Sequence, residues 1–246
     1  MQAIEKGRVI YAGIQKFVSF IMSVHFAEVL QILLCIVCST PVMRQPLQIL
    51  FLILVTDLPY SIALGFEPGE ALTMKRNPRP KSQPVVTVWM WHRIVVNGVI
   101  LCVCNFCTYM LCLWAYAGAF ATDDIKSIRR ARTVAFISLV WAEGFHAYSS
   151  RSFEDSVWMQ TSRNSCMNYA FLMVQVTLVL ALFIPGLNTD VLGLYVYEIQ
   201  GFGWFLALIG ALCSLFSCEV YKSFAAKSEQ VRAMPFEEEA SAKKYN

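Results

Sequence analysis

Charged side chains are scarce in this 246-residue chain: they make up 15% of it, whereas soluble domains carry about 25%. Hydrophobic residues account for 57%, and the mean hydropathy is +0.52. The net charge of +3 is small, and the basic residues gather near the ends of apolar segments rather than along one face. These features exclude a nucleic-acid-binding protein and predict a membrane protein in contact with a lipid bilayer.

Motifs of common enzyme classes are also missing. The sequence contains no phosphate-binding loop, no nucleophile elbow and no HExxH zinc motif, so we predict no catalytic and no cofactor-binding residue. Its start, MQAIEKGRVIYAGIQKF, lacks the apolar core and cleavage site of a signal peptide. The 9 cysteines include no pair of CxxC half-sites, and their apolar surroundings favour packing over metal or redox roles.

Six apolar stretches are long enough to cross a bilayer as helices, which takes about 20 residues each. They predict an all-α, polytopic membrane protein: a six-helix transmembrane bundle over residues 1–222, followed by a cytosolic polar tail over residues 223–246. The predicted spans are 14–38, 46–65, 89–117, 131–149, 168–186 and 202–221.

An even number of spans places both termini on one side of the membrane, and the distribution of Lys and Arg indicates which side. Most basic residues fall with the termini and the 66–88 and 150–167 loops. The positive-inside rule therefore predicts cytosolic termini, although the basic 126–132 segment runs against it. The basic residues of the opposite loops are Arg44, Lys126, Arg129, Arg130 and Arg132.

The 66–88 loop is the one long internal connection. Its prolines favour an extended, exposed strip, and the sequence KRNPRPK gives that strip a basic face. Such a loop either docks on a partner domain with an acidic surface or simply links two helices.

Three acids fall near the middle of predicted spans: Glu28, Asp57 and Glu143. A charge at the bilayer centre costs about 2.5–3.5 kcal/mol on insertion scales, and we expect no Lys or Arg at matching depth. His25 stands one helical turn before Glu28, and His146 stands one turn after Glu143. The acids are therefore either protonated or converge on a cation, and three of them in one bundle favour an ion path.

The stretch LVTDLPYS adds a helix breaker to one of these acids. Pro59 has no N–H and clashes with the Val55 carbonyl, so we expect the second helix to be unwound near Asp57 and Pro59. Freed backbone carbonyls beside the Thr56 hydroxyl and the Asp57 carboxylate form a set of oxygen ligands. Oxygen ligands suit Ca²⁺, Mg²⁺ or an alkali cation, so the pattern indicates transport rather than enzyme chemistry.

Four segments carry a resemblance to a known family: GRVIYAGIQKFVSFIMSVHFAEV, LQILFLILVTDLPYSIALGFEPGE, MKRNPRPK and ARTVAFISLVWAEGFHAYSS. In order and spacing they resemble membrane helices five to ten of the type II P-type cation-transporting ATPases, and look most like the sarco/endoplasmic reticulum calcium pumps. The resemblance runs from residue 7 to about 222, is strongest over the first two spans and around Glu143, and is weak over the last two.

The resemblance implies a set of Ca²⁺ ligands. Glu28 matches the fifth-helix glutamate that binds Ca²⁺ and returns protons. Thr56 and Asp57 match ligands on the unwound sixth helix, and Glu143 matches the eighth-helix glutamate of the first calcium site. The 66–88 loop matches the loop that touches the phosphorylation domain.

Two positions depart from the calcium pumps. His25 and Ile53 stand where those pumps have asparagine ligands. Ile53 has no side-chain oxygen, so we expect the second calcium site to be impaired, whereas His25 is either a nitrogen ligand or a proton acceptor. The first site keeps its ligands, and we therefore expect one transported ion per cycle: Ca²⁺ first, Na⁺ or another monovalent cation second.

The resembling family hydrolyses ATP, with Mg²⁺, through an aspartate in a DKTGT motif. This chain contains no DKTGT, no TGES and no nucleotide domain, so we expect it not to hydrolyse ATP alone. The hydrolysis would come from an N-terminal catalytic half, in a longer protein or a separate polypeptide, that meets the 66–88 loop.

Two other functions stay open: a non-catalytic membrane regulatory or interaction protein, and a proton or cation channel, for which no filter-like element is visible. The final KKYN resembles the dilysine retrieval signal of endoplasmic-reticulum membrane proteins. It either predicts that organelle or belongs to a solvated charged tail.

Overall fold

The computed structural model describes residues 2–68, 84–120, 122–153, 156–159 and 164–232, with side chains up to residue 225. Every regular element within these ranges is helical, as predicted for an all-α protein. The long helices are α1 (Gln2–Val37), α4 (Val88–Ala117), α5 (Ile125–Ser149), α6 (Ser165–Phe183) and α7 (Gly201–Arg232). One further rod is composite: α2 (Pro46–Phe51), η1 (Leu52–Asp57) and α3 (Leu58–Gly65). Short helical turns complete the chain: η2 (Val157–Met159), η3 (Leu187–Val191) and η4 (Val196–Glu198).

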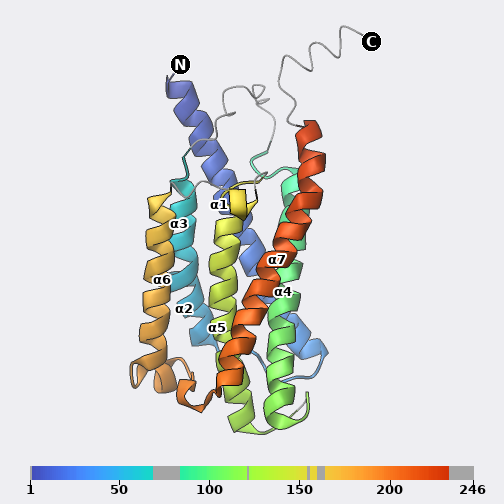
Figure 1. Ribbon diagram of the computed structural model, residues 1–246, viewed down its shortest axis with the longest axis vertical. Helices are drawn as coiled ribbons and strands as arrows, with labels where there is room; N and C mark the ends of the chain where they lie inside the picture. Colours follow the sequence, from blue (N-terminus) through green and yellow to red (C-terminus); the bar gives the residue numbers. More distant parts are fainter. Residues whose placement is uncertain (1, 69–83, 121, 154–155, 160–163, 233–246) are drawn as a thin grey trace.

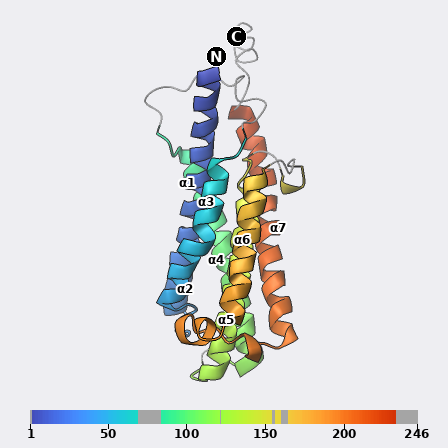
Figure 2. The ribbon, with the colours of Figure 1, turned by 90° about the vertical axis from the view of Figure 1, so that its left-hand side faces the viewer.

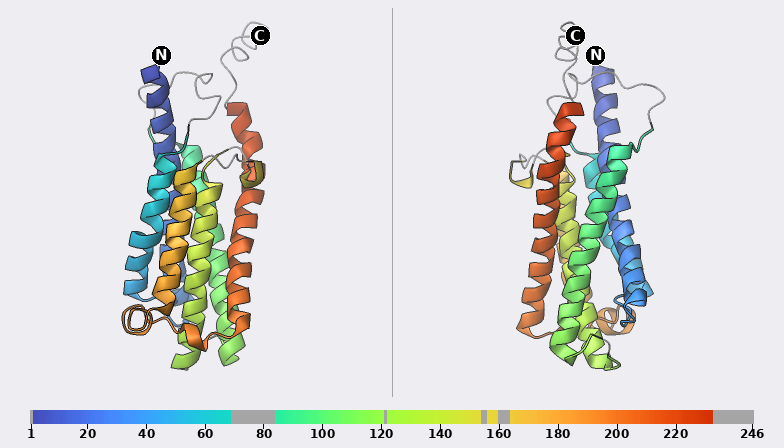
Figure 3. Two further views of the ribbon diagram at one scale, coloured as in Figure 1. Left: turned by 60° about the vertical axis from the view of Figure 1, so that its left-hand side comes forward. Right: turned by 90° about the vertical axis from the view of Figure 1, so that its right-hand side faces the viewer.

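The six rods form an elongated bundle with their axes close to parallel (Figure 1). Helix α1 begins and α7 ends at the same end of the bundle, which is the arrangement that the six predicted spans require. The composite rod lies beside α6 (Figure 2), and α4 lies between α1 and α7 (Figure 3). Helix α5 is central, because it packs against every other rod.

Five of the rods are long and apolar enough to span a membrane. The exception is α5, whose first two turns hold four basic residues and whose middle is rich in small and polar side chains. Most of its side chains are buried against the other rods. A helix enclosed by protein needs small residues for close packing more than it needs a fully apolar surface.

The helix ends differ from the predicted spans where local chemistry decides them. Helix α1 begins well before residue 14 and extends beyond the bundle. Asp124 caps α5 by accepting hydrogen bonds from the backbone N–H groups of Lys126 and Ser127. Helix α6 ends at Phe183, because the residue before a proline favours extended backbone and Pro185 follows Ile184.

The predicted interruption of the second rod takes the form of a π-helix over Leu52–Asp57, and the expected unwound backbone near Asp57 and Pro59 is not what the structure shows. The chain stays helical, with one wider turn that leads into α3 and places Pro59 in its first turn. A first turn tolerates proline, because its N–H groups have no partner inside the helix. Wider π turns of this kind are frequent at functional sites.

Two predicted segments fall largely outside the described residues. Of the 66–88 loop, residues 69–83 are not described, and this part includes KRNPRPK. Of the predicted tail, residues 223–232 continue α7 as a helix, while residues 233–246, with the KKYN end, are outside the described ranges.

Candidate cation-binding site

Three of the predicted ligands converge where α1 meets the end of η1. His25 and Glu28 are three residues apart and share one face of α1, and Asp57 closes the π-helix. The His25 Nδ1 atom lies 3.1 Å from Glu28 Oε2 and 3.8 Å from Asp57 Oδ2. One ligand atom from each residue fits within 4.8 Å of the others, which is the spacing that a shared metal ion needs.

The carboxylate of Asp57 is buried without any hydrogen-bond partner among the described residues. The side chain is 2% exposed, and both oxygens lack a donor. The two oxygens of Glu143, on α5, also have no hydrogen-bond partner among the described residues. Glu143 interacts electrostatically with Asp57 and Glu28. Unpaired buried carboxylates are costly, so four acceptor atoms without partners, on two carboxylates that interact electrostatically, favour the binding of a cation.

Thr56 and Ile53 take different orientations on η1. Thr56 is fully buried, and its hydroxyl donates to the Leu52 carbonyl, which leaves the hydroxyl oxygen able to accept or to coordinate. Ile53 lies at the surface of the bundle, 36% exposed. Ile53 therefore supplies no side-chain oxygen to the cluster.

The expectation that no Lys or Arg reaches the acids is wrong. Arg44 lies in the 38–45 connection, yet its Nη1 is 2.9 Å from Glu28 Oε1, and the two side chains are only 2% and 7% exposed. The connection folds back into the bundle, which brings a residue of a membrane-edge loop to the depth of Glu28. Burial lowers the pKa of the Arg44 guanidinium, and the neighbouring Glu28 opposes that shift. Arginine nevertheless keeps its charge in proteins.

Two hydrogen bonds hold the 38–45 connection in this position. The Tyr109 hydroxyl, on α4, donates to the Pro41 carbonyl at 2.8 Å. The Arg132 Nε, on α5, donates to the Val42 carbonyl at 2.7 Å. Met43, just before Arg44, is buried in the hydrophobic core. The position of Arg44 is thus fixed by three separate contacts of its own loop.

His146 does not form a second histidine–acid pair with Glu143. Its Nε2 lies 2.8 Å from the Ser23 hydroxyl, and its ring stacks on Phe20 with the centroids 5.7 Å apart. Both partners are on α1. His146 therefore joins α5 to α1, whereas His25 belongs to the acid cluster.

The cysteines are free thiols spread over the bundle. In the part of the chain that the structure describes, the one group of three or more His, Cys, Asp and Glu residues with metal-binding spacing is the His25 cluster, which contains no cysteine.

Arg44 is the residue of the site that the sequence did not indicate. Hydrophobic periodicity places it in a loop, and a loop arginine is ordinarily solvated. The one available signal is that Arg44 is the only charged residue between the first two spans.

The comparisons with known proteins find similarity to cation-transporting ATPases. The family model "Cation transporting ATPase, C-terminus" matches residues 41–224, which begins after α1. The P-type sodium-transporting ATPase4 of Plasmodium falciparum is 32% identical over 149 residues, 60% of this chain and 12% of the relative. The calcium-transporting ATPase of Bacillus subtilis is 31% identical over 166 residues, 68% of this chain and 17% of the relative. Calcium-transporting ATPase 1 of Bacillus cereus is 24% identical over 216 residues, 85% of this chain and 24% of the relative. The chain thus spans between 12% and 24% of the length of these relatives.

Proposed function

The chain belongs to the family of C-terminal membrane regions of cation-transporting P-type ATPases, and from this premise we propose that it binds the transported ion at the cluster of Glu28, Asp57 and Glu143 and carries one cation per cycle. Asp57 and Glu28 are the principal ligands. Thr56 and Glu143 support them, and His25 is a ligand or a proton acceptor.

The observation that carries this proposal is the Asp57 carboxylate. It is buried beside a second acid from another element, Glu28, and both of its oxygens lack a hydrogen-bond partner among the described residues. A π-helix ends at the same residue. Such an acid is expensive in a membrane protein, and ionisable groups at this depth usually mark an ion path.

Charge balance supports one Ca²⁺ as the transported ion. The three carboxylates bring three negative charges, and Arg44 contributes one positive charge through its contact with Glu28. The remaining two negative charges match a single divalent cation. Four unpaired carboxylate oxygens are also the kind of ligand that Ca²⁺ prefers.

Na⁺ or another monovalent cation is the second candidate. The specific observation is His25, whose ring nitrogen lies 3.1 Å from Glu28 and 3.8 Å from Asp57. When this ring is protonated it neutralises one more carboxylate charge, and the single negative charge that remains matches a monovalent cation. The relatives point to both ions, since their printed names include sodium-transporting and calcium-transporting ATPases.

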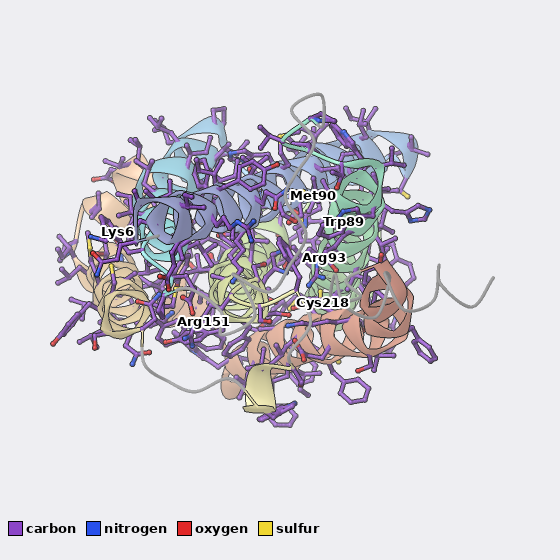
Figure 4. The ribbon with its side chains drawn as sticks, turned by 90° about the horizontal axis from the view of Figure 1, so that it is seen from above. Lys6, Trp89, Met90, Arg93, Arg151 and Cys218 are labelled. Atoms are coloured by element: carbon purple, nitrogen blue, oxygen red, sulfur yellow. The ribbon has the colours of Figure 1, made fainter. Side chains whose placement is uncertain are left out.

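The energy for transport would come from the catalytic parts of a P-type ATPase, with ATP and Mg²⁺ bound there. We place the end of the bundle where α1 begins in the cytosol. Figure 4 shows the bundle from that end, with three of its basic side chains: Lys6 of α1, Arg93 of α4 and Arg151 just after α5. The positive-inside rule supports this orientation, and the endoplasmic reticulum is the membrane that we propose.

The test is ion binding by the complete pump with Asp57→Asn, which keeps the shape of the side chain but removes its charge. The matched control is Asp190→Asn, because Asp190 is an exposed acid in the short turn η3 that follows α6. We expect wild type and the control to bind one Ca²⁺ per pump, and Asp57→Asn to bind none. Equal binding by Asp57→Asn and wild type would refute the assignment, and one Na⁺ in place of Ca²⁺ would select the second candidate.

A further inference from the structure

We propose that Arg44 is a tethered counter-cation that competes with the transported ion for Glu28 and sets how strongly the site prefers divalent over monovalent cations. This inference rests on the function proposed above, because it needs the cluster of acids to be the ion site. Arg44 would then determine specificity from a loop, without being an ion ligand itself.

Glu28 has no free oxygen in this structure. Its Oε1 accepts from Arg44 Nη1 at 2.9 Å, and its Oε2 lies 3.1 Å from His25 Nδ1. The acceptors without partners belong to Asp57 and Glu143. A cation can therefore approach Asp57 and Glu143 without meeting a bound donor, whereas at Glu28 it shares each oxygen with a nitrogen that is already there and is repelled by the Arg44 charge.

The Arg44 guanidinium is held close to the acids even when it leaves Glu28. Pro41 and Val42 are bonded to α4 and α5, so the backbone just before Arg44 is fixed to the bundle. The second terminal nitrogen, Nη2, is buried and has no hydrogen-bond partner among the described residues. Arg44 thus has an unused donor that another acceptor could take up.

A fixed positive charge acts more strongly on a divalent ion than on a monovalent one. Coulomb energy is proportional to the charge of the ion, so repulsion from Arg44 counts twice for Ca²⁺ and once for Na⁺. Removing the guanidinium should therefore raise affinity for both ions, and the factor for Ca²⁺ should be near the square of the factor for Na⁺.

A purely structural role for the same ion pair makes the opposite prediction. If Arg44 only holds the 38–45 connection in place, its loss leaves Glu28 unpaired and the loop displaced. Ligand geometry would then deteriorate, and affinity for both ions would fall.

The experiment measures apparent affinities for Ca²⁺ and for Na⁺ in the complete pump carrying Arg44→Gln. We expect the apparent affinity to rise about tenfold for Na⁺ and about a hundredfold for Ca²⁺. A tenfold change corresponds to the low end of the coupling energies measured between close charge pairs. Arg44→Lys keeps the charge and should stay near wild type. The matched control is Arg129→Gln. This variant removes the charge of an exposed side chain near the start of α5, which lies over the Tyr195 ring.

A second pair of variants keeps the test decisive if Arg44→Gln does not fold. Glu28→Gln with Arg44→Gln replaces both members of the buried pair, which proteins tolerate better than losing one. Compared with Glu28→Gln alone, the double variant should again gain more affinity for Ca²⁺ than for Na⁺. Equal factors for the two ions, or weaker binding of both, would overturn the role of Arg44. If Asp57→Asn still abolishes binding in that case, the proposed ion site stands and only this inference fails.

Discussion

Arg151 and Glu67 form a two-pronged ion pair between the end of α5 and the start of the 66–88 loop. Arg151 donates from Nε to both Glu67 oxygens, at 3.1 and 3.2 Å, and from Nη2 to Oε1 at 2.9 Å. Asn164, which caps α6, donates to the second oxygen of the same carboxylate. The side chains of Arg151 and Glu67 are 6% and 10% exposed. Both ends of the α5–α6 connection, at Arg151 and Asn164, therefore meet the start of the 66–88 loop at one carboxylate.

Breaking this pair should destabilise the fold. We expect Arg151→Ala to lower the free energy of unfolding by about 3 kcal/mol, because a buried carboxylate loses its charged partner. Thermal unfolding of the chain in detergent measures the effect. The control is Arg130→Ala. Arg130 pairs with Glu198 at 3.4 Å, and both side chains are about a third exposed. Exposed pairs of that kind contribute about 0.2–1 kcal/mol. Similar losses for the two variants would contradict the importance of burial.

The two histidines with the same three-residue spacing from an acid should behave differently. His25→Gln changes a side chain that contacts Glu28 and lies near Asp57, so we expect ion affinity to change by about tenfold, as when supporting contacts of a metal site are disturbed. His146→Gln should leave ion affinity unchanged and lower stability by about 1–3 kcal/mol, because it removes the contact with Ser23 and the stacking on Phe20. Ion titration and thermal unfolding of both variants separate the two roles, and a loss of ion affinity in His146→Gln would contradict this division.

Gly144, next to Glu143, is a point of close approach between α5 and two other rods. A Cβ atom there would lie 2.8 Å from Tyr60 Oη and 2.9 Å from a ring carbon of Phe171. We expect Gly144→Ala to destabilise the bundle by about 1–3 kcal/mol through overpacking. Gly7→Ala on α1 is the control, because nothing lies within 4 Å of its Cβ and alanine favours helix by about 1 kcal/mol. Thermal unfolding should therefore move in opposite directions for the two variants.

The sequence was sufficient for the parts of the site that stand out against an apolar background. Glu28, Asp57 and Glu143 are conspicuous because an acid in a long hydrophobic run is rare. Pro59 marked the position of the π-helix, although the form of the distortion depends on how η1 packs and was predicted wrongly. The start of α5 at Ile125 was missed, because its first turns are basic and largely exposed, and an apolar span does not report a polar extension of the same helix.

Arg44 could not be predicted for a different physical reason. A local pattern reports whether a segment is helical and apolar, but it does not report whether a connection returns into the bundle. That depends on Tyr109 and Arg132, which are more than sixty positions away and reach Pro41 and Val42. Contacts of this range are set by tertiary packing alone.

The π-helix before Pro59 should be required for ion binding rather than for folding. Proline at position 59 denies the Val55 carbonyl its usual helical donor, and Pro59→Ala restores that donor. We expect the turn to tighten toward α-helix, which shifts Thr56 and Asp57 by about one residue, or roughly 100° around the axis. Affinity for the transported ion should then fall by about tenfold or more, while thermal stability stays the same or rises.

Pro46→Ala is the matched control for that experiment, because Pro46 occupies the first turn of α2, where no helical hydrogen bond depends on residue 46. Ion titrations of the complete pump carrying each variant provide the comparison. If Pro59→Ala and Pro46→Ala bind the ion equally well, the wider turn is not what orients Asp57 toward Glu28. If Pro59→Ala binds weakly and is also less stable, the turn serves the fold as well as the site. Weak binding at unchanged stability would show that the backbone of this rod is distorted for the ion.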